Sequence, residues 1–189
     1  MIRIQRITPA HPLYPQEVEL REAVLLRPIG YDLAKFSAAY PVEDKAEHFV
    51  AIFDHPTGPK VVGCALLLPP GVIPGPAGGA SGQAAGSSGG APTGEGPRRA
   101  KLMQMAVHPQ RQGEGIGRRL VIAVEARALG ELGVDELFCH AQDRAIGFYE
   151  SLGWESEGDW FVEAGIQHKR MVARPVPTIA PFETAEIEE

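Results

Sequence analysis

The strongest constraint on the fold is a glycine-rich turn that lies between a strand pattern and an amphipathic helix pattern. Residues 106–120 read AVHPQRQGEGIGRRL, in which Gly113, Gly115 and Gly117 alternate with other residues. Glycine permits positive φ values and the close approach of a ligand. The first turn of a helix also presents unpaired N–H groups at the positive end of the helix dipole. The turn therefore predicts a phosphate cradle at a helix N-terminus.

Two other phosphate motifs do not fit this stretch. A dinucleotide fingerprint, G-x-G-x-x-G, would need a third glycine where Arg118 stands. A P-loop would need Gly-Lys-Ser/Thr, which the stretch lacks. A bare Gly-x-Gly-x-Gly is a weak signal by itself, so a tight turn without a ligand stays open as the alternative.

The N-terminal part of the chain predicts one strand and one helix. Ile2 and Ile4 alternate with polar residues, which favours a short strand. Pro15 suits the first turn of a helix and Pro28 suits its stop, so we expect a helix from about Pro15 to Leu26. Residues 29–44 are mixed, and we expect a loop with room for one helical turn.

A hairpin is expected next. The runs 47–54 and 60–68 are rich in strand-forming residues and flank a segment that contains Pro56 and Gly58. This pattern predicts two antiparallel strands joined by a loop of about five residues.

The C-terminal part predicts the elements around the glycine turn. Residues 101–107 read as a strand, and Leu120, Val124 and Ala128 recur at the four-residue spacing of an amphipathic helix. Gly133 can supply the left-handed residue that closes this helix. The expected elements are the strand at 101–107, a helix from about Ile116 to Leu132, a strand at 136–141, a short helix at 144–152 that stops at Gly153, and strands at 154–163 and 166–173.

Two segments lie outside this pattern. Residues 69–97 contain 10 Gly, 6 Pro, 5 Ala and 3 Ser among 29 residues. Such a composition buries too little apolar surface to offset its ordering entropy, so we expect a disordered insertion in one domain that spans residues 1–173. The proline-rich and acidic tail, residues 174–189, is expected to be loose.

Composition narrows the classes of function. The 189 residues suit one domain, and the formal net charge of −6 argues against nucleic acid as the main partner. We expect no membrane span, because no run reaches the roughly 20 apolar residues that one needs. The start of the chain lacks the pattern of a signal peptide, so we expect a cytoplasmic protein. Cys64 and Cys139 lie in apolar runs and are expected to be buried free thiols.

The glycine turn and a second motif together resemble the GNAT acyltransferase superfamily. That family's pyrophosphate loop reads Gln/Arg-x-x-Gly-x-Gly/Ala, which Gln112, Gly115 and Gly117 match after the strand end MAVHP. The family's later motif reads Asn-x-x-Ala-x-x-Phe-Tyr-x-x-x-Gly-Phe. We match to it Asp143 in place of Asn, Ala145, Phe148, Tyr149, Gly153 and Trp154 in place of Phe. The stretch FVEAGIQHKRM also looks like the end of many GNAT chains.

The resemblance implies an α/β fold with a mixed central sheet, the order β-α-β-β-β-α-β-α-β-β and helices on both faces. It implies acetyl-CoA as cosubstrate and no metal. The strands 101–107 and 136–141 would splay apart to admit the pantetheine arm, which would pair with the backbone of Met105 and Val107 as an added strand. The expected cofactor-binding residues are Met105, Ala106, Val107, Gln112, Gly113, Glu114, Gly115, Ile116, Gly117, Arg118, Asp143 and Phe148.

Catalysis needs a neutral amine and a protonated leaving thiolate. Tyr149 is the expected general acid, since a phenol can donate to a thiolate. His168 is the candidate general base, because histidine titrates near neutral pH and this residue lies on a terminal strand that could face the acceptor, with an ordinary surface or core histidine as the alternative. A water relay needs no dedicated base, and Gln104 stands where some family members carry a carboxylate. The other candidate bases are His48, His108, His140 and Glu22.

Several basic residues are candidates for binding charged groups of the substrates. Arg21 and Arg27 flank the first helix and could hold an acceptor carboxylate, although ordinary solvated arginines are the simpler interpretation. Arg98, Arg99 and Lys101 could reach the 3′-phosphate of CoA or could only keep a loop end soluble.

The function implied by the resemblance is direct transfer of acetyl from acetyl-CoA to a primary amine in a ternary complex. A non-catalytic acyl-CoA-binding sensor or interaction module is the alternative, because it would keep the glycine turn without needing a proton donor. The amine is not indicated by the sequence. No membrane partner is expected, and a homodimer is compatible with the family.

Overall fold

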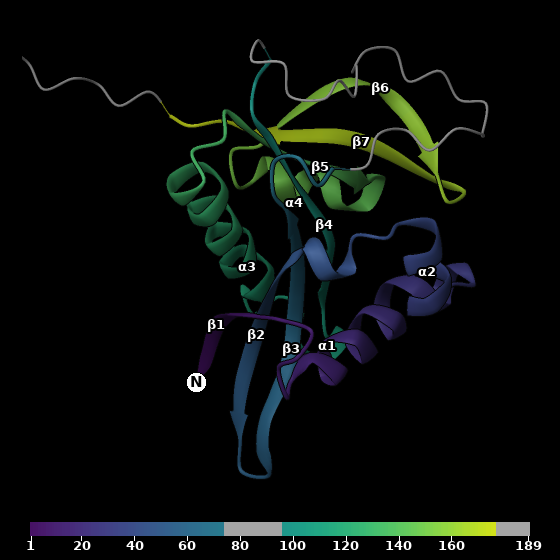
Figure 1. Cartoon of the computed structure of the whole chain (residues 1–189), viewed down its shortest axis with the longest axis vertical. Coiled ribbons are helices and arrows are strands. Elements are labelled where there is room, and N and C mark those ends of the chain that lie inside the picture. Colours follow the sequence, from purple (N-terminus) through teal and green to yellow (C-terminus); the bar gives the residue numbers. More distant parts are fainter. Residues whose placement is uncertain (74–95, 177–189) are drawn as a thin grey trace, which may run out of the picture.

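The computed structural model describes residues 1–73 and 96–176, and it places seven strands in one mixed sheet (Figure 1). The sheet order is β1-β2-β3-β4-β5-β7-β6. All pairs are antiparallel except β4 with β5, which are parallel. The strands are β1 (Ile2–Ile7), β2 (Glu47–His55), β3 (Gly58–Leu68), β4 (Arg99–Val107), β5 (Glu136–Gln142), β6 (Glu155–Glu163) and β7 (Ile166–Ala173).

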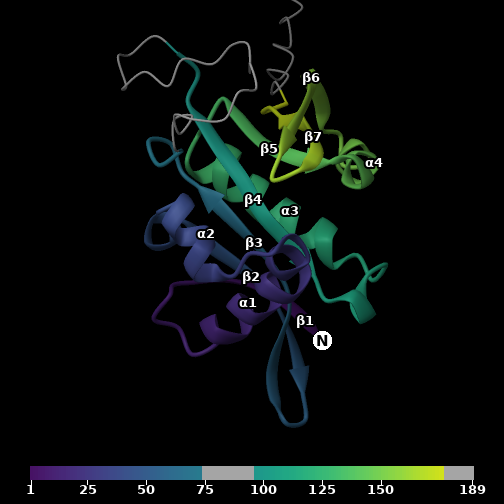
Figure 2. The same ribbon diagram turned by 90° about the vertical axis from the view of Figure 1, so that its right-hand side faces the viewer.

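Helices cover both faces of this sheet, as expected (Figure 2). On one face, α1 (Tyr14–Arg21) continues through a π-helical turn (Glu22–Leu26), and α2 (Leu33–Ala39) follows it. On the other face, α3 (Ile116–Glu125) continues through a π-helical turn (Ala126–Glu131) and is followed by α4 (Ile146–Glu150). The α/β class and the expected element order are confirmed, with α2 added.

Two apolar cores lie on the two faces. Leu120 and Val124 of α3 pack over strand residues such as Leu102, Leu137 and Met171. Leu20 of α1 packs on the opposite face over Val50, Ile52 and Cys64. Residues Val61–Leu68 of β3 are all buried because both faces of that strand are covered. Cys64 and Cys139 are buried and free, as predicted.

β4 contains a β-bulge that changes which face its residues reach. In a regular strand, residues an odd number apart lie on opposite faces. Leu102 and Val107 are five residues apart, yet both pack on the α3 side. The extra residue is found opposite Ala65, where both Gln104 and Met105 face a single residue of β3. Gln104 takes the left-handed φ of 48°, which lets the strand resume after the bulge.

Two local predictions differ from the structure. Residues 29–44 contain the two-turn helix α2, which begins at Asp32, whose carboxylate accepts a hydrogen bond from the Lys35 N–H at 2.7 Å. The β2–β3 hairpin closes with two residues, Pro56 and Thr57, because both strands extend further than their apolar runs.

Some of the remaining predictions concern residues that the structure does not describe, and others are confirmed. The expected disordered insertion and tail fall largely on residues 74–95 and 177–189, which lie outside the described residues. Gly133 and Gly153 close their helices with φ of 59° and 86°, as predicted. Within the described part of the chain, no helix is long and apolar enough to cross a membrane.

Candidate functional site

A gap opens between β4 and β5. The two strands pair only from Arg99 opposite Glu136 to Lys101 opposite Phe138. Beyond that point β4 stays paired with β3, while β5 turns away with β7. Figure 1 shows β6 and β7 running across the molecule while β2 and β3 follow its long axis. One backbone edge of β4, from Leu102 to Val107, is therefore left without a partner strand in the described sheet.

The glycine turn lies at the end of this open edge and begins α3. Gly113 has a φ of 81° and Gly115, the residue that caps α3, has a φ of 74°. A Cβ added at either glycine would meet no atom within 4 Å, so the outer side of the turn is open. Gly117 has another role, because a Cβ there would lie 3.3 Å from the Phe148 ring of α4.

Side chains hold the glycine turn in place, and one neighbouring cation, Arg118, takes no part in this bracing. Gln112 donates from Nε2 to the Val107 carbonyl at 3.3 Å, which ties the loop to β4. Arg111 pairs with Glu114 at 2.6 Å, and Arg119 donates to the Ile2 carbonyl at 2.7 Å. Arg118 makes no ion pair with any described residue. The first-turn amides of α3 and Arg118 are thus the groups available to an anion.

A cleft of about 510 Å³ opens at the end of β5. Leu25, Pro28 and Ile29 line one side of it, and Gln142, Asp143, Arg144, Ile166 and Gln167 line the other. The cleft therefore lies between the end of the first helix and the β6–β7 hairpin, beside the gap between β4 and β5.

Asp143 lies in this region, but our match of that residue to the family's Asn was one position late. Counted back three residues from Ala145, the position falls on Gln142. Gln142 is the last residue of β5, and its Oε1 accepts a hydrogen bond from Arg144 Nε at 3.0 Å. Both Gln142 and Asp143 line the cleft, so each can contribute polar contacts there.

Tyr149 lies on α4 in the apolar core of the α3 side and is 6% exposed. Its ring lies 5.1 Å from those of Phe148 and Trp154. Burial, and then the neighbouring Cys139 thiol, raise the pKa of the Tyr149 hydroxyl well above its usual value. The phenol is therefore protonated at neutral pH, the form that a proton donor requires.

His168 and His140 lie on the face of the sheet that faces α1 and α2. His168, 8% exposed, bonds through Nδ1 to the Ile166 carbonyl at 2.9 Å. His140 bonds through Nδ1 to Glu163 Oε2 at 2.8 Å. A carbonyl or carboxylate can only accept, so each Nδ1 donates and each neutral ring keeps Nε2 as an acceptor.

The His140 pair is the more accessible of the two arrangements. The side chains of His140 and Glu163 are 28% and 34% exposed. Burial and the nearby Lys101 ammonium lower the pKa of His140, despite the opposing effect of Glu163. The hydrogen bond from His140 is the main cause that lowers the pKa of Glu163 to about 2.

Sequence reasoning missed Glu163 and Tyr40 at this site. Tyr40 ends α2, and burial followed by the charge of Glu163 raises its pKa, so α2 approaches the β6–β7 hairpin. Asp32, a good N-cap before a helical run, was the signal that could have located α2. Glu163 directly precedes the Ala164–Gly165 turn, and no local motif marks it.

The other candidate bases have structural roles. His108 Nδ1 accepts from the Gln110 N–H at 3.3 Å, and Glu22 accepts from the Leu33 N–H at 2.9 Å. Arg27 pairs with Glu19 and Glu22. Arg21 is not a solvated arginine, because it is fully buried, and His48 is fully buried beside it.

The basic residues at the start of β4 lie far from the glycine turn. β4 spans Arg99–Val107, and eight steps of about 3.3 Å give roughly 26 Å. Arg99 pairs with Glu136 at 3.0 Å, and the Arg98 guanidinium donates to the Gly133 carbonyl. This placement does not suit binding of a phosphate close to a pyrophosphate on the glycine turn.

Comparisons with known proteins agree with this geometry. Residues 83–175 match the family model of the acetyltransferase (GNAT) domain. A segment of 65 residues is 35% identical to an uncharacterized ycf52-like N-acetyltransferase of Prochlorococcus marinus, covering 34% of this chain and 36% of that protein. The match spans only 36% and 38% of the lengths of two curated relatives.

Solved structures share the fold over most of the chain. An acyl-CoA N-acyltransferase from Pseudomonas aeruginosa is similar with a TM-score of 0.60 and 17% identity, over 91% of this chain and 99% of that one. A GNAT family acetyltransferase from Elizabethkingia anophelis, crystallised with acetyl-CoA bound, is similar with a TM-score of 0.58 and 14% identity, over 92% and 98%. At such identities the likeness concerns the fold.

Proposed function

We propose that the chain is an N-acetyltransferase of the GNAT superfamily, whose domain model matches residues 83–175, and that it transfers acetyl from acetyl-CoA directly to a primary amine. The observation that carries the proposal is the continuity of two features. The open glycine turn at the start of α3 lies at the end of the unpaired edge of β4. A phosphate-binding turn and a peptide-like edge in one line suit a ligand with a pyrophosphate at one end and an amide-containing arm at the other.

The residues present fit acetyl-CoA. The backbone of residues 105–107 would pair with the pantetheine arm, and the turn at 112–118 would hold the pyrophosphate on its amides, with Arg118 adding charge. Gln142 joins Asp143 as a candidate contact beside the arm. When bound, acetyl-CoA supplies an activated acyl thioester. A backbone N–H on the open edge of β4 could polarise its carbonyl.

The chain's own residues would handle two protons. Tyr149, kept protonated by burial, would donate to the departing thiolate. The amine must lose a proton, and two neighbouring histidines, His140 and the expected base His168, are candidates to accept that proton at Nε2. His140 has the better position for this step, because Glu163 orients its ring and it is partly exposed. The cleft is lined by Gln142 of β5, the strand that carries His140, and by Ile166 of β7, the strand that carries His168, so we place the amine there.

The first experiment measures thermal unfolding with CoA, acetyl-CoA and NAD in parallel. At 100 times Kd, a ligand that binds only the folded chain adds about 2.7 kcal/mol. For a domain of this size that is roughly 5–10 °C in Tm. A shift with CoA and acetyl-CoA but not with NAD supports the proposal. No shift with either CoA species would leave the glycine turn without its proposed ligand.

A second experiment separates catalysis from binding alone. Release of free thiol from acetyl-CoA is followed with a panel of primary amines and a peptide with a free N-terminus. We expect Tyr149→Phe to lower turnover by roughly 10²–10⁴ while the Kd for acetyl-CoA stays similar. Tight binding without thiol release from any amine would favour the acyl-CoA sensor instead. An unchanged rate in Tyr149→Phe would remove that residue from the role of acid.

A further inference from the structure

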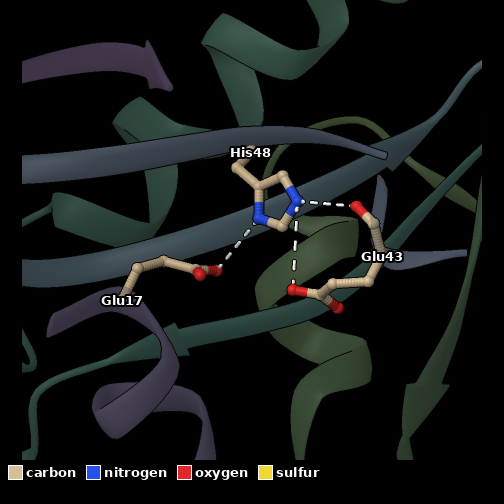
Figure 3. Close-up of side chains that lie close together, drawn as sticks. All are labelled: Glu17, Glu43 and His48. Carbon is tan, nitrogen blue, oxygen red and sulfur yellow. Dashed lines mark hydrogen bonds and ion pairs between the residues drawn. The ribbon is translucent and has the colours of Figure 1, made fainter. Parts of the chain in front are cut away.

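A buried ionic cluster lies between α1 and the sheet, behind β4. Arg21 is fully buried and holds Glu43 with two guanidinium nitrogens, Nη1 at 3.1 Å and Nη2 at the other oxygen. Its Nε lies 2.9 Å from Glu17 Oε1. His48 of β2 completes the cluster, with Nε2 donating to the Glu43 carbonyl at 3.0 Å and Nδ1 3.5 Å from Glu17 (Figure 3).

The cluster resembles a metal site but already has its cation. Ligand atoms of Glu17, Glu43 and His48 lie within 4.8 Å of one another. Both carboxylates, however, face the Arg21 guanidinium. This positive charge would repel a metal ion, so the guanidinium would have to move away before a metal could bind. Arg21 is therefore the cation that faces both carboxylates, and its position is fixed from two sides.

Arg21 also reaches out of the cluster to the bulge in β4. Its Nη1 donates to Gln104 Oε1 at 2.7 Å. Gln104 is the bulge residue with a φ of 48°, a conformation that a residue with a side chain adopts only where its surroundings hold it. The bulge lies in the stretch of β4 that has lost β5 as a partner. Among the strands that the structure describes, only β3 thus pairs with this part of the backbone.

We propose that Arg21 and Gln104 are positioning residues that fix the bulged segment of β4 so that its open edge can hold the acyl end of acyl-CoA. The inference rests on the proposed function, because the next residues, Met105–Val107, are those expected to pair with the pantetheine arm. The charged cluster anchors Arg21, Arg21 anchors the Gln104 side chain, and Gln104 sets the direction of the following amide groups. A side chain on the far face of the sheet thereby controls a contact on the open edge.

Acetyl-CoA and CoA differ only at the acyl end, so the ratio of their affinities isolates this contact. Calorimetry gives Kd for both ligands with the wild type, Gln104→Met, which removes the acceptor, and Gln104→Glu, which keeps one. Gln5→Met makes the same substitution on β1, far from the gap, and serves as the matched control. We expect Gln104→Met to weaken acetyl-CoA relative to CoA by about fivefold to tenfold, as for the loss of one hydrogen bond. Gln104→Glu and Gln5→Met should keep the wild-type ratio.

Gln104→Gly is a second test of the inference, in case the other Gln104 variants fail to fold. Glycine accepts a φ of 48° without strain, which offsets part of the lost hydrogen bond from Arg21, so this variant should fold and still lose acyl discrimination. Equal affinity ratios in wild type, Gln104→Met and Gln104→Gly would overturn the inference. A wild type that binds neither CoA nor acetyl-CoA would instead refute the proposed function, which is a different outcome.

Discussion

The protein has two histidine–carboxylate pairs on the same side of its sheet, and they lie in opposite environments. His48 with Glu17 and Glu43 is sealed between α1 and β2, and the His48 and Glu17 side chains are fully buried. His140 with Glu163 is partly open to solvent beside the gap between β4 and β5. The sealed pair is shut off from solvent, whereas the open pair can exchange a proton with it. The same chemistry therefore serves structure in one place and is available for catalysis in the other.

The pKa values of the two histidines are shifted in opposite directions. For His48, burial opposes protonation, but the bonds to Glu17 and the Glu43 carbonyl prevail and raise its pKa. For His140, burial and the Lys101 ammonium prevail over Glu163 and lower its pKa. A histidine kept neutral is ready to accept a proton, which is the state required of a base.

The largest expected effect tests the sealed region. Arg21→Met should destabilise the fold by about 3–5 kcal/mol, because it leaves the Glu17 and Glu43 carboxylates buried without their cation. Chemical denaturation with the wild type alongside measures the loss. Arg27→Met is the matched control, since its ion pairs are exposed and little change is expected. Equal losses in both variants would show that burial of the cluster does not matter.

The next prediction concerns the open pair. His140→Gln should lower turnover about 100-fold, as for loss of a general base, with the Kd for acetyl-CoA unchanged. The assay uses the amine that releases most thiol in the panel. His168→Gln is measured beside it. If His168→Gln shows the larger loss, the base is His168 and the assignment to His140 is wrong.

A third prediction compares the pH dependence of stability. The folded pKa of His48 is raised, so its contribution is present below about pH 6.5 and is lost as pH rises through the folded pKa. The folded pKa of His140 is lowered, so its contribution is present above about pH 6.5 and is lost as pH falls. Denaturation of wild type, His48→Gln and His140→Gln from pH 5 to 9 should give difference curves of opposite slope. Slopes of the same sign would break the comparison.

The smallest expected effect concerns the neighbours of His140. Lys101 is one of the groups that lower its pKa, alongside the opposing Glu163 and the nearby His168. Lys101→Met should therefore raise the pKa of His140, which proton NMR of the imidazole C–H signals can follow. A pKa that does not move, or that falls, would show that the Lys101 charge does not lower the pKa of this ring.

Most of the fold could be predicted because its signals are local. The helix period of Leu120 and Val124, the stops at Gly133 and Gly153, and the glycine turn each lie within one short stretch. The elements that were missed depend on contacts across the chain. The β2–β3 strands extend to a two-residue turn because pairing continues past the apolar runs, and α2 carries a weak apolar pattern behind a clear cap at Asp32.

The site was less predictable for the same reason. The turn and the motif around Tyr149 could be found because their spacing is fixed within one segment. The pairing of His140 with Glu163, and that of Arg21 with Gln104, join residues 23 and 83 positions apart. No spacing rule brings such residues together, and Arg21 therefore read as a surface arginine. Packing of α1 against β4 places it in the interior.

The short pairing of β4 with β5, which covers only three residue pairs, also gives a way to detect a ligand in the gap without measuring turnover. Alternate amide groups of residues 102–107 point toward the gap, where no described strand protects them, while the others bond to β3. Hydrogen–deuterium exchange at these amides should therefore be fast on one side of a single strand and slow on the other. A molecule seated in the gap would slow the fast set alone, so the exchange pattern of one strand would report binding residue by residue.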